Sequence, residues 1–62
     1  MNNAEKALVY DDCIRQVEIL QREVSKIKAE FVGNIPHQAQ LRINENEIKI
    51  GKLVGRLENL FR

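Results

Sequence analysis

The first half of the chain carries an apolar residue at every third or fourth position. This spacing keeps one side of a helix apolar along its whole length. Asn3 to Val32 contain no glycine or proline, so nothing in this stretch interrupts a helix. We predict a helix over about residues 4–32, with a core seam that consists of Tyr10, Cys13, Val17, Leu20, Val24, Ile27 and Phe31.

The segment "VGNIPHQ" predicts the end of this helix and a reversal of the chain. Gly33 can adopt the left-handed conformation that closes many helices. Pro36 has no backbone N–H and cannot continue a preceding helix. We therefore place a turn at residues 33–36.

The second half of the chain has two interpretations. Apolar and polar residues alternate in "AQLRINENEIKI", which is typical of a short β-hairpin, but an isolated two-stranded hairpin is marginally stable in water. A spacing of three and four instead predicts a helix over about residues 37–61. Asn44 and Glu47 resemble a capping box, in which case this helix starts only near residue 45. The helical interpretation extends the core seam to Ile43, Ile50, Val54, Leu57 and Phe61, with Glu47 as a charged member.

We predict an all-α fold, an antiparallel two-helix hairpin formed by a single domain over residues 1–62. The alternative is a long helix, a short β-hairpin and a C-terminal helix. A chain of 62 residues rarely gains more than about 3–5 kcal/mol from its own core. With one cysteine and one histidine, it cannot form an internal disulfide or a structural zinc site alone. We therefore expect a homo-oligomer, preferably a dimer that forms a four-helix bundle with coiled-coil-like packing.

Two other surfaces of the second helix are candidates for binding. Paired glycines let two helices approach closely, which predicts a partner or oligomer interface formed by Leu41, Ile48, Gly51 and Gly55. The same glycines are also compatible with a solvent-exposed face. A basic strip is a possible anion-binding site, although such strips are usually solvated; it comprises Arg42, Lys49, Lys52 and Arg56.

Composition gives weak support for nucleic-acid binding and none for catalysis. Ten basic and nine acidic residues give a net charge of +1, whereas nucleic-acid-binding domains usually carry a basic excess. The sequence has no glycine-rich phosphate loop and no pair of histidines. We expect Cys13 to be an inert thiol in the core and His37 to be an exposed turn residue. We therefore predict a protein that is not an enzyme and has no cofactor and no metal.

We expect a cytoplasmic location without membrane association, because no apolar run approaches 18 residues. The leading functional hypothesis is a small regulatory interaction protein of a class that phages and mobile elements often encode. It would self-associate and bind a larger protein as an adaptor, assembly factor or inhibitor. One alternative is binding of nucleic acid or an anionic nucleotide through the basic strip. The other is a purely structural oligomerisation module.

Overall fold

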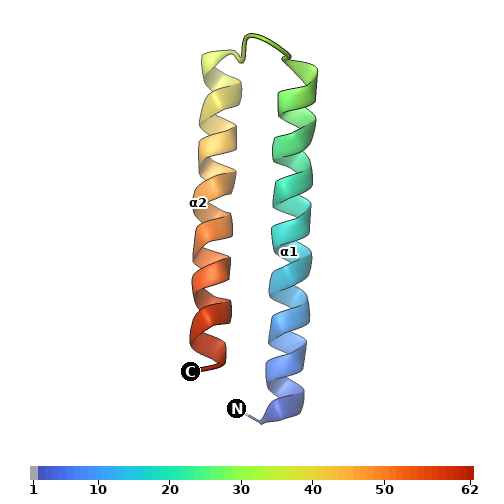
Figure 1. Ribbon diagram of the computed structural model, residues 1–62, viewed down its shortest axis with the longest axis vertical. Coiled ribbons are helices and arrows are strands. Elements are labelled where there is room, and N and C mark those ends of the chain that lie inside the picture. Colours follow the sequence, from blue (N-terminus) through green and yellow to red (C-terminus); the bar gives the residue numbers. More distant parts are fainter. Residues whose placement is uncertain (1) are drawn as a thin grey trace.

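Two antiparallel helices make up the fold. The computed structural model describes residues 2–62, with α1 at Asn3–Glu30 and α2 at His37–Leu60 (Figure 1). The predicted all-α helical hairpin is confirmed. The described residues contain no strand, so the β-hairpin alternative is wrong. The molecule is a rod of 47 × 15 × 13 Å, with both chain ends at the same end of the rod.

The ends of the helices follow from local sequence. The side chain of Asn2 caps α1, because its Oδ1 accepts a hydrogen bond of 2.8 Å from the backbone N–H of Glu5. Gly33 has the predicted left-handed conformation, with φ of 91°. The second helix starts directly after Pro36, whose φ of −57° already suits a helix start. The capping-box start near residue 45 is therefore wrong. Asn44 lies inside α2, where its Oδ1 accepts a hydrogen bond from Gln40.

The core is a single seam between α1 and α2, divided into two clusters. Cys13 and Val17 of α1 pack against Leu53 of α2 near the open end of the hairpin. Near the turn, Val24, Ile27 and Ile43 form the second cluster. Half-buried apolar side chains extend both clusters: Val9, Leu20, Ile50 and Leu57 in the first, and Phe31, Ile35 and Ala39 in the second. From Cys13 to Phe31, the seam on α1 uses the residues that the sequence indicates.

The seam on α2 differs from the prediction. Leu53 and Asn46 are buried there, whereas Val54 remains 40 % exposed and Phe61 64 % exposed. Glu47 is also exposed. The predicted and observed seams share Ile43, Ile50 and Leu57. Between these shared residues the prediction uses Glu47 and Val54, whereas the structure uses Asn46 and Leu53. Burial of an amide costs less than burial of a carboxylate, and this difference favours the pattern that turns Asn46 inward and Glu47 outward.

Tyr10 is also outside the core, with 41 % of its surface exposed. It lies near the open end of the hairpin, where its ring meets that of Phe61 edge to face at a centroid distance of 5.9 Å. The two rings cover the end of the seam from one side. Cys13, one turn further along α1, is 1 % exposed and takes the central position.

Asn46 is the one polar side chain buried among residues 2–62, with 6 % of its surface exposed. It lies along α2 between Ile43 of one cluster and Leu53 of the other. Its Nδ2 donates a hydrogen bond to the backbone carbonyl of Leu20 at 3.5 Å, which is long for such a bond. A polar residue at one seam position fixes the alignment of two helices at the expense of stability. Asn46 therefore interrupts the apolar core and connects α2 to α1 at one position along the rod.

Asn46→Leu should stabilise the hairpin. The apolar gain from burying leucine is about 1.5–3 kcal/mol, and the lost hydrogen bond is worth about 0.5–1.5 kcal/mol. We expect the free energy of unfolding to rise by about 1 kcal/mol, measured by urea denaturation followed by circular dichroism. Asn44→Leu makes the same chemical change at an exposed position and should alter stability by less than about 0.5 kcal/mol. A loss of stability in Asn46→Leu would show that the bond to Leu20 outweighs apolar burial.

Candidate functional site

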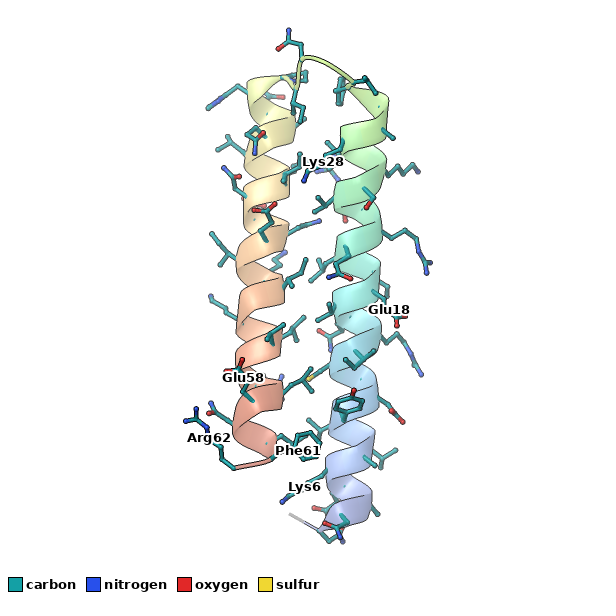
Figure 2. All side chains as sticks on the ribbon, viewed as in Figure 1. Lys6, Glu18, Lys28, Glu58, Phe61 and Arg62 are labelled. Atoms are coloured by element: carbon teal, nitrogen blue, oxygen red, sulfur yellow. The ribbon has the colours of Figure 1, made fainter. Side chains whose placement is uncertain are left out.

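An apolar patch lies on one broad face of the hairpin at its open end. We call it the open-end patch; it consists of Tyr10, Ile14, Val54 and Phe61. Tyr10 and Ile14 lie one turn apart on α1. Val54 lies on α2, and Phe61 follows the last residue of that helix. In Figure 2, the ring of Phe61 lies at the end of α2 and points toward α1. Ile14 is half-buried and the other three side chains are exposed. The patch thus spans both helices beside the core.

The same face becomes polar toward the turn. A shallow hollow there is lined by Gln21, Ser25 and Glu47, with Val24 and Ile50 beneath them. Lys28 lies further toward the turn, between the two helices in the view of Figure 2. The apolar part of this face is therefore confined to the open half of the rod.

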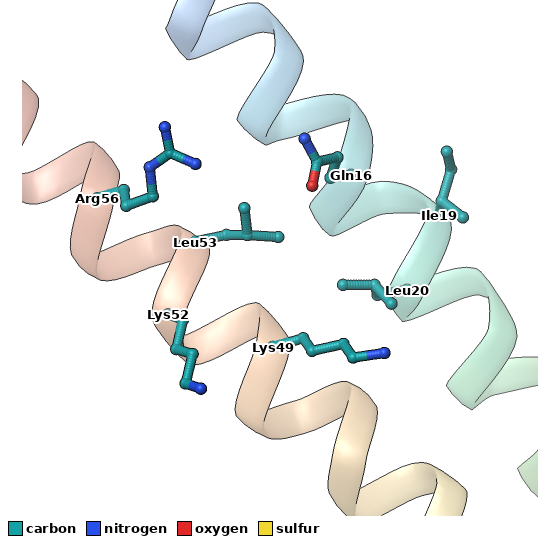
Figure 3. Close-up of a pocket in the computed structure, with 7 residues that line it drawn as sticks. All are labelled: Gln16, Ile19, Leu20, Lys49, Lys52, Leu53 and Arg56. Atoms are coloured by element: carbon teal, nitrogen blue, oxygen red, sulfur yellow. The ribbon is translucent and has the colours of Figure 1, made fainter.

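The opposite face carries a basic groove. At 100° per residue, Gln16 and Lys49 lie across the seam from Tyr10 and Val54. The groove is an open hollow of about 470 Å³ between the two helices (Figure 3). Gln16, Ile19 and Leu20 of α1 line one side, and Lys49, Lys52, Leu53 and Arg56 of α2 line the other.

Most of the predicted basic strip lies along this groove. Arg42 is outside it and forms a salt bridge of 2.8 Å with Glu23. Within residues 2–62, no carboxylate lies within salt-bridge distance of Lys49, Lys52 or Arg56. The other polar side chain of the lining, Gln16, donates a hydrogen bond of 2.7 Å to Asp12. The groove therefore has an apolar floor and three unpaired positive charges along one edge.

The predicted glycine interface lies on the side of α2 that faces away from α1. Leu41, Ile48 and Gly51 are exposed, and Gly55 is half-buried. A Cβ atom built on either glycine would have no neighbouring atom within 4 Å. Nothing in the single chain approaches this stripe closely, and its role in binding a partner stays a prediction.

The remaining candidate residues are not brought together. Cys13 is buried in the seam, and His37 is exposed at the first position of α2. Across the described part of the chain, no group of three histidine, cysteine or acidic side chains could hold a metal ion. Neither α1 nor α2 has a stretch long and apolar enough to cross a membrane.

Comparisons with protein-family models, curated proteins and solved structures found no match to this chain. A proposal about function therefore rests on the surfaces of the chain itself. The cations of the groove were predicted from the sequence as part of the basic strip, but Ile19 and Leu53 of its apolar lining were not predicted as site residues. Ile19 lies outside the seam of α1. Leu53 lies between Lys49 and Arg56 along α2, and it reaches the floor of the groove because α2 packs through Ile50 and Leu57. The one sequence signal for this lining was the pair of adjacent apolar residues Leu53 and Val54, either of which could face α1.

Gly51→Ala should stabilise the hairpin if the outer side of α2 faces water. Alanine is favoured over glycine inside a helix by about 0.8–1.0 kcal/mol, and space around Gly51 is open. We expect the free energy of unfolding to rise by about that amount in chemical denaturation. Gly33→Ala is the matched control and should lower stability by roughly 1–2 kcal/mol, because its φ of 91° disfavours a side chain. Destabilisation by Gly51→Ala would reveal a close neighbour from another chain.

Proposed function

We propose that this chain is a non-enzymatic helical interaction module. It forms a homodimer through the open-end patch and presents its other helix faces to a larger protein. In this role it would act as an adaptor, an assembly factor or an inhibitor. The observation that carries the proposal is the large surface of the single chain.

The accessible surface of the chain is 4947 Å² for a mass of 7.2 kDa. A compact monomer of this mass exposes about 4100 Å². The excess of about 800 Å² is close to the area that each partner buries in a standard protein interface. A second copy of the hairpin, packed face to face, removes this excess by forming a four-helix bundle.

The open-end patch is the part of the surface that suits such a contact best. Tyr10, Val54 and Phe61 are large exposed hydrophobic residues on one face, and aromatic side chains are enriched in the cores of protein interfaces. In a two-fold dimer the same patch is used by both copies, so Tyr10 and Phe61 of each chain would contribute to one contact. The polar half of this face, around Gln21 and Glu47, would form the rim.

A purely structural oligomerisation module would use the same patch without a further partner. The exposed surfaces on the remaining sides favour the interaction role. Leu41 and Ile48 on the outer side of α2, and Ile19 beside the basic groove, are exposed in the single chain. They lie away from the open-end patch, so a dimer formed through that patch would leave them exposed. These side chains remain free for a different protein.

Val54→Lys should weaken the dimer. It places a charge in the proposed contact, where removing that charge from water is strongly unfavourable, yet Val54 is exposed enough in one chain for the hairpin to fold. We expect sedimentation equilibrium to show a dissociation constant at least about tenfold higher than that of the unmodified chain. Circular dichroism should report unchanged helicity.

Ile48→Lys provides the matched control. It makes a comparable change on the outer side of α2, where 60 % of Ile48 is exposed. The proposal predicts that this variant dimerises normally. A loss of the dimer in Ile48→Lys, with Val54→Lys unaffected, would show that the dimer forms through the predicted glycine interface instead. A monomeric unmodified chain at high concentration would contradict the dimer altogether.

A further inference from the structure

We infer that the basic groove docks an acidic amphipathic helix from a partner protein. This inference rests on the proposed interaction function and identifies both the surface and the chemistry of the partner. The groove, lined by Gln16, Ile19, Leu20, Lys49, Lys52, Leu53 and Arg56, lies on the face opposite the open-end patch. A dimer formed through that patch therefore leaves the groove accessible in each chain.

The floor of the groove fits the apolar stripe of a third helix. Leu20 and Leu53 project from the two helices into the space between them (Figure 3). Ile19 lies at the edge of α1 and is 55 % exposed. Two antiparallel helices form a long shallow channel between them, and recognition of an amphipathic helix in such a groove uses apolar anchors every three or four residues. Docking would extend the hairpin locally into a three-helix arrangement.

The charges of the groove require acidic residues on one flank of that helix. Lys49, Lys52 and Arg56 are spaced by three and four residues, so they follow α2 for about 10 Å. Carboxylates with the same spacing on an antiparallel or parallel helix would lie opposite them. None of the three cations has a salt-bridge partner among the residues that the structure describes. Pairing with the incoming helix would therefore break no existing ion pair.

The opposite edge of the groove disfavours a nucleic acid. Asp12 lies beside Gln16 on α1, and Glu23 lies further along the same edge, where it holds Arg42. A nucleic acid carries negative charge along its whole backbone and would approach these two carboxylates. An amphipathic helix can confine its acidic side chains to the flank near α2. The asymmetry of the two edges thus favours an acidic helix over a polyanion.

Binding of a designed peptide tests this inference. The probe is a fluorescently labelled helical peptide of about 18 residues, roughly 27 Å long, with leucines at spacings of three and four and glutamates along one flank. A second peptide has glutamine at every glutamate position. Fluorescence anisotropy should show that the glutamate peptide binds the chain at least about tenfold more tightly, as expected when three exposed ion pairs are formed.

Neutralisation of the groove should remove this preference. In the triple variant Lys49→Gln, Lys52→Gln and Arg56→Gln, we expect affinity for the glutamate peptide to fall to that of the glutamine peptide. The matched control is Arg15→Gln, Arg22→Gln and Lys26→Gln, which removes three positive charges from the exposed outer side of α1. This control should bind as the unmodified chain does. Equal losses in both variants would overturn the inference, because they would show attraction by net charge alone.

A second substitution tests the apolar part of the groove. Ile19→Gln removes an exposed apolar side chain and should weaken peptide binding about fivefold without unfolding the hairpin. Ile48→Gln, on the outer side of α2 where Ile48 is similarly exposed, should leave binding unchanged. An unaltered affinity in Ile19→Gln would contradict docking in the groove.

Two further ligands test whether the groove binds something other than an acidic helix. The inference predicts that a single-stranded oligothymidylate and vesicles containing phosphatidylglycerol bind more weakly than the glutamate peptide. Tighter binding of either, abolished by the triple groove variant, would overturn it in favour of nucleic acid or an anionic membrane surface. Sedimentation equilibrium separates this test from the proposed dimer. A monomeric chain that binds the glutamate peptide contradicts only the dimer, whereas a dimer that does not prefer this peptide contradicts only the groove.

Discussion

The apolar seam between α1 and α2 is the contact on which every other feature of this protein depends. It is the interface between the two helices of the fold, and within residues 2–62 it contains six buried apolar side chains. A layer of two helices buries one side of each and exposes the rest. The seam also sets the rotation of each helix about its axis. It therefore decides which side chains face solvent and on which side of the rod they gather.

The rotation of α2 separates two surfaces of opposite character. With Leu53 turned inward, Val54 and Phe61 lie on one flank of the seam and Lys49 and Arg56 on the other. One broad face thus becomes apolar at its open end, and the other becomes a groove with a cationic edge. In our account the first face joins two copies of the chain and the second receives a different protein. The two proposed contacts would use different sides of the same layer and would not compete.

The hairpin was predictable because three local signals agree with it: an unbroken seam on α1, a glycine at Gly33 and a proline before α2. The alternation of apolar and polar residues in the first half of α2 pointed instead to a β-hairpin, and the structure contradicts it. The predicted seam of α2 was wrong because Leu53 and Val54 are adjacent apolar residues that fit two patterns sharing Ile43, Ile50 and Leu57. Burial of Asn46 rather than Glu47 distinguishes the patterns through the lower desolvation penalty of an amide. The groove was not predictable for the same reason, since its floor contains Leu53. Its cations were visible in the sequence, but two of their apolar neighbours, Ile19 and Leu20, come from α1.

The most direct test of self-association is the thermal unfolding of the unmodified chain at two concentrations about a hundredfold apart. If the folded state is a dimer that dissociates on unfolding, the midpoint rises with concentration. For two chains of 62 residues and an unfolding enthalpy of about 0.7 kcal/mol per residue, the rise is about 10 °C. Circular dichroism at 222 nm over this range should show it. An identical midpoint at both concentrations would mean that the hairpin folds as a monomer, and it would contradict the account.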